Sequence, residues 1–135
     1  MLRDHDSSAI VAVADLDRAR AFYSDVLGLE LASGGGDGMP LVYRTGSTTL
    51  TVYPSKEAGT NQANAVVWGV GGDLDTIVAA LEAKGADFQH YPEIGRLDGN
   101  VHVIPGMGPD GGDARLAWFK DPDGNILHLN NLPMP

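Results

Sequence analysis

Two stretches of the chain share one pattern of apolar and polar positions. Residues 9–14 form a short apolar run rich in β-branched side chains, which predicts a strand. Apolar residues at helical spacing follow, and Gly28 can adopt the left-handed conformation that ends a helix. The same order returns in the second half, where residues 65–70 predict a strand and Gly85 ends the helix. The two predicted apolar helix faces are Leu16, Ala19, Tyr23, Val26 and Leu27, and Leu74, Ile77, Val78 and Leu81.

Each half then closes with a predicted hairpin centred on a glycine. The turn glycines are Gly46 and Gly124, and the flanking runs carry β-branched and aromatic residues. An internal repeat of this size predicts two copies of one small structural unit. The paired strands are predicted at residues 41–44 and 48–53, and at 116–119 and 126–129; further strands are predicted at 29–32, 86–90 and 101–104.

The segments between these elements are rich in glycine, proline and polar residues. Residues 33–38 predict a turn, and residues 54–64 predict the linker between the two halves. Residues 105–113 contain several glycines and prolines, so we expect an irregular segment that can act as a flap. Asp15 or Asp17 in the first half and Asp73 in the second are predicted helix N-caps.

The length of 135 residues predicts one domain, because neither half could bury a core alone. We place module one at about residues 8–54 and module two at about 64–131. There is no cysteine, which excludes disulfides and thiolate chemistry. No apolar run reaches membrane-spanning length and the N-terminus shows no signal region, so we expect a cytoplasmic protein without a membrane partner.

The formal net charge of −9 argues against a nucleic-acid partner, because phosphate binding needs clustered lysine and arginine. The acidity serves solubility, and it also favours a cationic ligand.

Two segments resemble the vicinal oxygen chelate superfamily, which includes glyoxalase I, extradiol dioxygenases and bleomycin resistance proteins. Residues 12–23, continued by residues 27–29, resemble the opening of these proteins, and residues 118–125 resemble their closing hairpin. The resemblance implies an α+β fold of two tandem βαβββ modules that form a curved sheet around a cleft. It also implies a symmetric homodimer. Enzymes of this family hold a divalent metal in the cleft, with His, Glu or Gln ligands from the first and last strands of each module.

The corresponding positions in this chain are poor in metal ligands. They hold Ser8, a residue near Ala65, the strand with Thr49, Thr51 and Tyr53, and His128. A lone imidazole does not hold a metal, so we predict no metal cofactor. The alternative is an unusual divalent metal site that uses His5, His90 or His102.

Strand alternation predicts which side chains line the cleft. Ser8, Ile10 and Ala12 should face it, as should Thr49, Thr51 and Tyr53, Ala65, Val67 and Gly69, and His128 with Ile126. Leu127 and Leu129 should face the helices, and His102 should be exposed beside the flap. The candidate ligand-binding residues are Ser8, Tyr43, Thr51, Tyr53, His102, Trp118 and His128.

Two functions remain open at this stage. The first is a metal-free protein that binds a small organic ligand between the modules, as antibiotic-sequestering members of the family do. The second is a lyase, isomerase or dioxygenase that uses an unusual metal site or His128 as a general base near neutral pH. In either case His128, Tyr53 and Trp118 should contact the ligand, with the flap closing over it.

Overall fold

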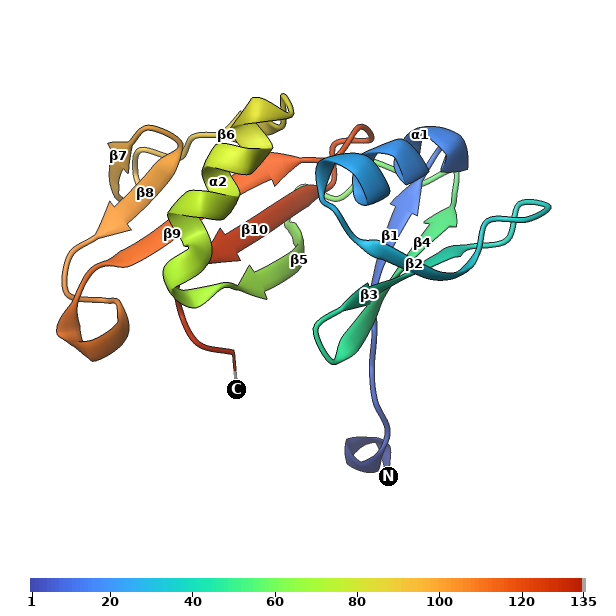
Figure 1. Cartoon of the computed structure of the whole chain (residues 1–135), viewed down its shortest axis with the longest axis horizontal. Helices are drawn as coiled ribbons and strands as arrows, with labels where there is room; N and C mark the ends of the chain where they lie inside the picture. The colour runs from blue at the N-terminus through green and yellow to red at the C-terminus, as the bar shows by residue number, and fades with distance from the viewer. Residues whose placement is uncertain (135) are drawn as a thin grey trace. The chain divides into compact units, whose positions relative to one another are not determined.

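The computed structural model describes residues 1–134 and shows an α+β protein with two β-sheets and two α-helices (Figure 1). The α+β class predicted from the sequence is therefore confirmed. The chain divides into two compact units. Unit 1 contains residues 1–65 and the turn Pro122–Asn125, and unit 2 contains Val66–Asp121 and the residues from Ile126 onward. Among the described residues no helix is both long and apolar enough to cross a membrane.

Unit 1 follows the predicted order of strand, helix and three strands. Its sheet has the order β1-β4-β3-β2, and β1 runs parallel to β4. A 3-10 turn, Leu2–Asp4, precedes the sheet. The elements are β1 (Ala9–Val13), α1 (Leu16–Arg20), a π-helical turn (Ala21–Val26), β2 (Glu30–Gly34), β3 (Leu41–Thr45) and β4 (Thr48–Pro54).

The first predicted helix is present but changes its winding halfway. Asp15 caps α1, because its carboxylate accepts hydrogen bonds from the N–H groups of Asp17 and Arg18 at 2.9 and 3.0 Å. After Arg20 the helix widens into the π-helical turn, where the Leu27 N–H donates to the Phe22 carbonyl five residues earlier. The apolar pattern did not predict this turn, in which Phe22, outside the predicted apolar face, is buried beside Tyr23.

The turn between the last two strands of the chain belongs to unit 1. Asp123 has a side chain only 5% exposed, and its carboxylate accepts from the Ala14 N–H at 3.0 Å and from Arg18 at 2.8 Å. The Asn125 amide donates to the Ala12 carbonyl at 2.8 Å. The Asp-Pro-Asp-Gly-Asn motif therefore completes the end of β1 and the start of α1.

Unit 2 repeats this topology with an additional hairpin. Its six-stranded sheet has the order β5-β10-β9-β8-β7, and β6 also pairs with β9. The first strand of each unit thus neighbours the last strand in its own sheet. The elements are β5 (Asn64–Gly69), a 3-10 turn (Gly71–Asp73), α2 (Leu74–Ala83), β6 (Asp87–Gln89), β7 (Arg96–Asp98), β8 (Val101–Ile104), a 3-10 turn (Pro109–Gly111), β9 (Ala114–Lys120) and β10 (Ile126–Asn130).

Unit 2 departs from the predicted repeat in two details. The strand β7 was not predicted, because three residues with the sequence Arg-Leu-Asp carry no apolar alternation. Asp73 occupies the predicted N-cap position of α2 but makes no capping hydrogen bond, since it is the last residue of the 3-10 turn and has a helical backbone conformation. Gly85, with φ 77°, ends the helical region as predicted.

Candidate functional site

In β1, β3 and β4 of the unit 1 sheet, one face is buried and the other is partly open. Leu50 and Val52 of β4 are completely buried, whereas Thr51 and Tyr53 between and beyond them are half-buried. The same alternation holds in β1, where Val11 is 2% exposed and Ile10 is 59% exposed. Thr51, Tyr53 and Ile10, which the sequence predicts to line the cleft, therefore lie on the partly open face.

Tyr43, one of the candidate ligand-binding residues, lies on the buried face of this sheet. Tyr43 pairs with Leu50 across β3 and β4, so both side chains lie on the buried face. Its ring packs against Tyr23 at 6.0 Å, and its hydroxyl hydrogen-bonds to Ser24 at 3.1 Å. The hairpin pattern predicted the strands, but it did not determine which parity of β3 faces the helix.

Thr51 lines an open cavity of about 800 Å³ on the partly open face. Val42 pairs with Thr51 and lines the same cavity, and so does Met39, which is 60% exposed. The segment between β2 and β3 forms the rim and contributes the carboxylate of Asp37. The lining residues are Ser33, Gly34, Gly36, Asp37, Met39, Pro40, Val42 and Thr51.

Ser8 is exposed, and its hydroxyl is engaged by the neighbouring strand. It donates to the Thr49 carbonyl at 2.7 Å and accepts from the Thr49 hydroxyl at 2.9 Å. These bonds join the residue before β1 to β4. Ser8 therefore serves the pairing of these two strands in unit 1.

Aromatic and imidazole rings gather on one face of the unit 2 sheet. His128 and Trp118 pair across β10 and β9, and their rings stack at 4.5 Å with an angle of 21°. The rings of His102 and Tyr91 lie perpendicular to the Trp118 ring, with their centroids 4.9 and 5.3 Å from its centroid. We name these four residues the ring cluster. It brings together three of the predicted site residues, and it adds Tyr91, which lies in a loop and gave no signal in the sequence.

His128 is 8% exposed and is held as a neutral imidazole with a defined tautomer. Its Nδ1 lies 3.1 Å from the Ala117 carbonyl, which can only accept, so Nδ1 carries the proton. Its Nε2 accepts a long hydrogen bond of 3.4 Å from the Asn130 amide, whose oxygen accepts from the Leu132 N–H. Burial lowers the pKa of His128, and nearby His102 lowers this pKa further, against the opposing effect of the Ala117 carbonyl. Nε2 is therefore a weakly engaged acceptor at neutral pH.

His102 is completely buried, so the prediction of an exposed histidine beside the flap is wrong. Its Nε2 accepts from the Tyr91 N–H at 2.8 Å, and its Nδ1 donates to the Leu116 carbonyl at 3.3 Å. Burial lowers the pKa of His102, and the Leu116 carbonyl only partly offsets this effect. Because both ring nitrogens are occupied in the neutral form, His102 has a structural role in this unit.

His90 is an exposed imidazole that two other elements orient. The Asn100 amide donates to the Glu82 carboxylate at 2.7 Å, which turns its oxygen toward His90. His90 Nε2 therefore donates to that oxygen, also at 2.7 Å. The chain of bonds ties α2 to the tip of the β7–β8 hairpin and to the end of β6.

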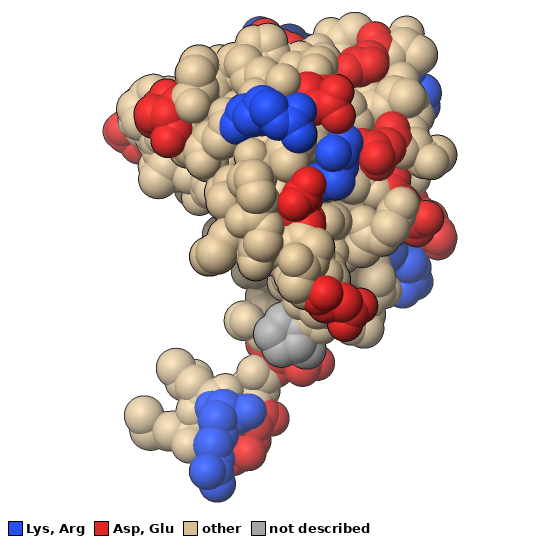
Figure 2. Space-filling model, turned by 90° about the vertical axis from the view of Figure 1, so that its left-hand side faces the viewer, with Lys and Arg blue, Asp and Glu red and all other residues tan. Residues whose placement is uncertain are grey.

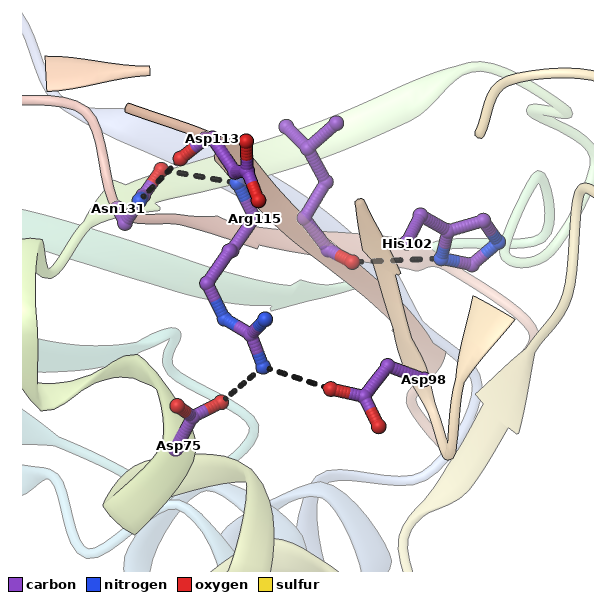
Figure 3. A network of polar contacts seen from close by, with 7 residues as sticks. Asp75, Asp98, His102, Asp113, Arg115 and Asn131 are labelled. Atoms are coloured by element: carbon purple, nitrogen blue, oxygen red, sulfur yellow. Dashed lines mark hydrogen bonds and ion pairs between the residues drawn. The ribbon is translucent and has the colours of Figure 1, made fainter. Parts of the chain in front are cut away.

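Arg115 forms a polar hub on the α2 side of the same sheet. Figure 3 shows its side chain reaching from β9 to Asp75 on α2 and to Asp98 on β7, at 2.8 and 3.3 Å. Its backbone N–H donates to the Asn131 side chain, which donates in turn to the Asp113 carbonyl. The two carboxylates raise the pKa of Arg115. A cavity of about 290 Å³ opens beside this hub, lined by Asp75, Val78, Ala79, Glu82, Asp98, Gly99, Asn100, Val101 and Arg115.

The donor groups of the chain do not fit the divalent metal that the family resemblance implies. Within residues 1–134, no three His, Cys, Asp or Glu side chains form a group that could hold a metal ion. At the expected positions, Ser8 is bound to Thr49, and both ring nitrogens of His128 face protein groups. His102 offers no ring nitrogen either, which also disfavours the alternative metal site.

A sequence model of the "Glyoxalase/Bleomycin resistance protein/Dioxygenase superfamily" matches residues 7–129. Among solved structures, a fosfomycin resistance protein, FosX, from Listeria monocytogenes has a TM-score of 0.71 at 15% identity and covers 96% of this chain and 94% of its own. A lactoylglutathione lyase from Agrobacterium tumefaciens has a TM-score of 0.65 at 19% identity, with coverages of 93% and 92%. An integron cassette protein from the metagenome of the Halifax Harbour sewage outfall has a TM-score of 0.63 at 20% identity, with coverages of 93% and 96%. No curated protein matches the chain.

Proposed function

Because the chain belongs to the glyoxalase/bleomycin resistance protein/dioxygenase superfamily, we propose that it binds a small organic molecule without a divalent metal ion. The observation that carries this proposal is the cavity beside Thr51 on the partly open face of the unit 1 sheet. Its lining combines apolar side chains with two hydroxyl groups and one carboxylate. A mostly apolar surface with a few polar groups is the usual composition of a small-molecule site.

The metal-free part of the proposal is supported by the chemistry of the donor groups. Hydroxyl groups of serine and threonine replace the imidazole and carboxylate ligands that a divalent metal prefers in this family. The one imidazole at an expected position, His128, donates from Nδ1 to a carbonyl. A ligand would therefore be held by hydrogen bonds and apolar contacts.

A cationic or partly aromatic ligand suits the charge of the protein. The net charge is −9, and the Asp37 carboxylate lies at the rim of the cavity. On the face shown in Figure 2, lysine and arginine side chains lie beside acidic ones and form no continuous patch. An antibiotic that carries a positive charge fits this description, and sequestering it would give resistance without catalysis.

Further ligand contacts are proposed at Tyr53, Trp118 and His128, with residues 105–113 as a closing flap. In this segment the Gly108 N–H donates to the Gly112 carbonyl, and Asp110 has φ 54°, so the loop is compact and carries a residue in the left-handed region.

We also propose a cytoplasmic homodimer. Light scattering at micromolar concentration should give twice the mass of 14.2 kDa, and a monomer mass would contradict the dimer.

Ligand-observed NMR on the full chain tests the binding proposal. The panel should contain small aromatic molecules with positive, zero and negative charge, all screened with EDTA present. Cations should bind best, and binding should persist in EDTA. Binding that appears only after zinc, nickel, iron or manganese is added would contradict the metal-free proposal.

A matched pair of threonine variants and one variant in unit 2 then locate the ligand. Thr51→Val keeps the shape of the side chain but removes the hydroxyl, so it should weaken binding by about 0.5–1.5 kcal/mol. Thr48→Val, on the exposed hairpin of the same strand, should leave binding unchanged. His128→Leu should weaken binding of a polar ligand by about 1–3 kcal/mol if the ligand also contacts unit 2. Equal affinities for Thr51→Val and Thr48→Val would remove Thr51 from the site.

A second candidate function is catalysis with His128 as a general base. The observation in its favour is the tautomer of His128, whose unprotonated Nε2 accepts only a long hydrogen bond. With a ligand in hand, turnover of that ligand that disappears in His128→Gln but survives EDTA would establish it. Unchanged turnover in His128→Gln would exclude this role.

A further inference from the structure

The imidazole of His102 fastens a loop to the unit 2 sheet. The loop, residues 91–94, follows β6, and its first N–H donates to His102 Nε2 at 2.8 Å. The Tyr91 ring stacks on the His102 ring, with the two centroids 6.0 Å apart. It lies perpendicular to the Trp118 ring, with the two centroids 5.3 Å apart. The hydrogen bond from the Ile94 N–H to the Tyr91 carbonyl is internal to the loop and does not anchor it. We call residues 91–94 the latched loop.

This hydrogen bond exists only while His102 is neutral. The Tyr91 N–H can only donate, so Nε2 must offer its lone pair. The other ring nitrogen already carries a proton, which it donates to the Leu116 carbonyl. A proton added to the ring therefore goes to Nε2, where it places two donors against each other and abolishes the bond.

We propose that His102 is an acid-operated latch, which on protonation releases the latched loop from the unit 2 sheet. Release of the loop would carry Tyr91 away from Trp118, the ring that stacks on His128. The latch stands on contacts within unit 2 and does not depend on the proposed ligand-binding function.

The groups around His102 determine in which direction pH acts. Burial disfavours the charged ring most, and His90, whose ring lies 6.4 Å away, opposes the charge as well. The His102 ring in turn lowers the pKa of His128 on β10. Glu93, in the latched loop, favours the charged ring but does not outweigh burial, so the pKa of the latched state lies below 6.5. Release of the loop removes part of the burial that disfavours the charged ring, so the pKa of His102 is higher in the released state than in the latched state.

The released state therefore binds the proton more readily, and acid favours release. Between the two pKa values the equilibrium constant for release rises up to about tenfold for each pH unit that the solution is lowered. Above pH 7 both states are neutral, and the equilibrium no longer depends on this histidine.

Amide hydrogen exchange of the full chain by NMR tests the latch between pH 7.5 and 5. The protection factor of the Tyr91 amide, which corrects for the intrinsic exchange rate, should fall up to about tenfold per pH unit below about 6.5. The Leu127 amide in β10 provides the reference for global unfolding, and its protection factor should stay above that of the Tyr91 amide at every pH. A Tyr91 protection factor independent of pH, or one that follows Leu127 throughout, would overturn the proposal.

Matched variants assign the effect to His102. In His102→Gln the side-chain oxygen can accept from the Tyr91 N–H but cannot titrate, so protection of Tyr91 should persist to pH 5. His90→Gln and His128→Gln should still lose Tyr91 protection as the pH falls, because His102 still titrates in both variants. A response unchanged in folded His102→Gln would overturn the assignment. If that variant does not fold, the comparison of Tyr91 with Leu127 in the parent still decides.

Discussion

The two units build similar sheets from one sequence pattern, yet they treat the second face of the sheet differently. In β4 of unit 1, buried Leu50 and Val52 alternate with half-buried Thr51 and Tyr53. In β10 of unit 2, all five residues are buried, including His128 and Asn130. The lesson is that one repeat can supply an accessible polar face in one copy and a closed polar face in the other. On a buried face, polar groups need hydrogen-bond partners within the protein, which explains the fixed tautomers in the ring cluster.

The edges of the two sheets also differ. In unit 1 the single strand β2 pairs with β3, with a register irregularity between Leu31 and Ser33. In unit 2 the corresponding edge of β9 is shared, because β6 pairs with residues 118–120 and β8 with residues 114–116. The latched loop and β7 lie between these two strands in the sequence. The additional hairpin thus gives unit 2 the residues that orient His90 and fasten Tyr91.

The largest effects should come from neighbouring positions in the two last strands. Leu50→Ala and Leu127→Ala should each lower the free energy of unfolding by about 2–5 kcal/mol, because each leaves a cavity in a filled core. Thr51→Ala should cost less than about 1 kcal/mol, since its face is partly open. His128→Ala should cost about 1–3 kcal/mol, because it removes the stack on Trp118 and leaves the buried Ala117 carbonyl without its donor. Urea unfolding followed by circular dichroism measures all four, and equal costs for Thr51→Ala and His128→Ala would contradict the contrast.

The next effect concerns the turn that unit 1 takes from the second half of the chain. Asp123→Ala removes an almost fully buried carboxylate that accepts from the Ala14 N–H and from Arg18, so it should destabilise the protein by about 1.5–3 kcal/mol. Asp37→Asn, at an exposed position on the cavity rim whose φ of 50° suits asparagine as well, is the control and should change stability by less than about 0.5 kcal/mol. Urea unfolding compares the two. A similar result for both would mean that the turn contributes little to unit 1.

The sequence predicted most elements of both units but not how their faces are used. Apolar alternation gave the strands on either side of Gly46 and Gly124, because it reflects the pleat directly. It could not place Tyr43, since a shift of one residue exchanges the faces of a strand. It could not show that His102 is buried either, because alternation marks one buried face and does not say whether the other is covered. The partners of His102 lie in a loop and on β9, and contacts at such distances leave no local pattern.

The pH dependence of stability should be larger for unit 2 than for unit 1, because three of the four histidines lie in unit 2. Burial lowers the pKa of His102 and of His128 in the folded protein, whereas in the unfolded chain both have pKa values near 6.5. The unfolded state therefore takes up more protons as the pH falls below about 6.5, and the folded state loses stability. The loss should reach up to about 1.4 kcal/mol per pH unit for each histidine, with no effect of these groups above pH 7.

Tryptophan fluorescence can follow this effect, because Trp68 and Trp118 both lie in unit 2. Urea unfolding should be measured at pH 7.5, 6.5 and 5.5, and the slope with pH should shrink in His102→Gln and in His128→Gln. A slope that both variants leave unchanged would show that other groups carry the pH dependence.

The smallest effect tests the repeat at its most similar point, the Asp-Leu-Asp segments that begin the two helices. Asp15 accepts two backbone hydrogen bonds at the start of α1, so Asp15→Ala should cost about 1 kcal/mol, and Asp15→Asn should retain most of the cap. Asp73 makes no capping bond, so Asp73→Ala should change the free energy of unfolding by less than about 0.5 kcal/mol. The physical reason is the backbone of the two residues: Asp15 is extended, with φ −133° and ψ 114°, whereas Asp73, with φ −84° and ψ 0°, is itself the last residue of a 3-10 turn. Urea unfolding of the three variants against the parent measures the difference. Equal losses for Asp15→Ala and Asp73→Ala would mean that the two segments are equivalent in solution.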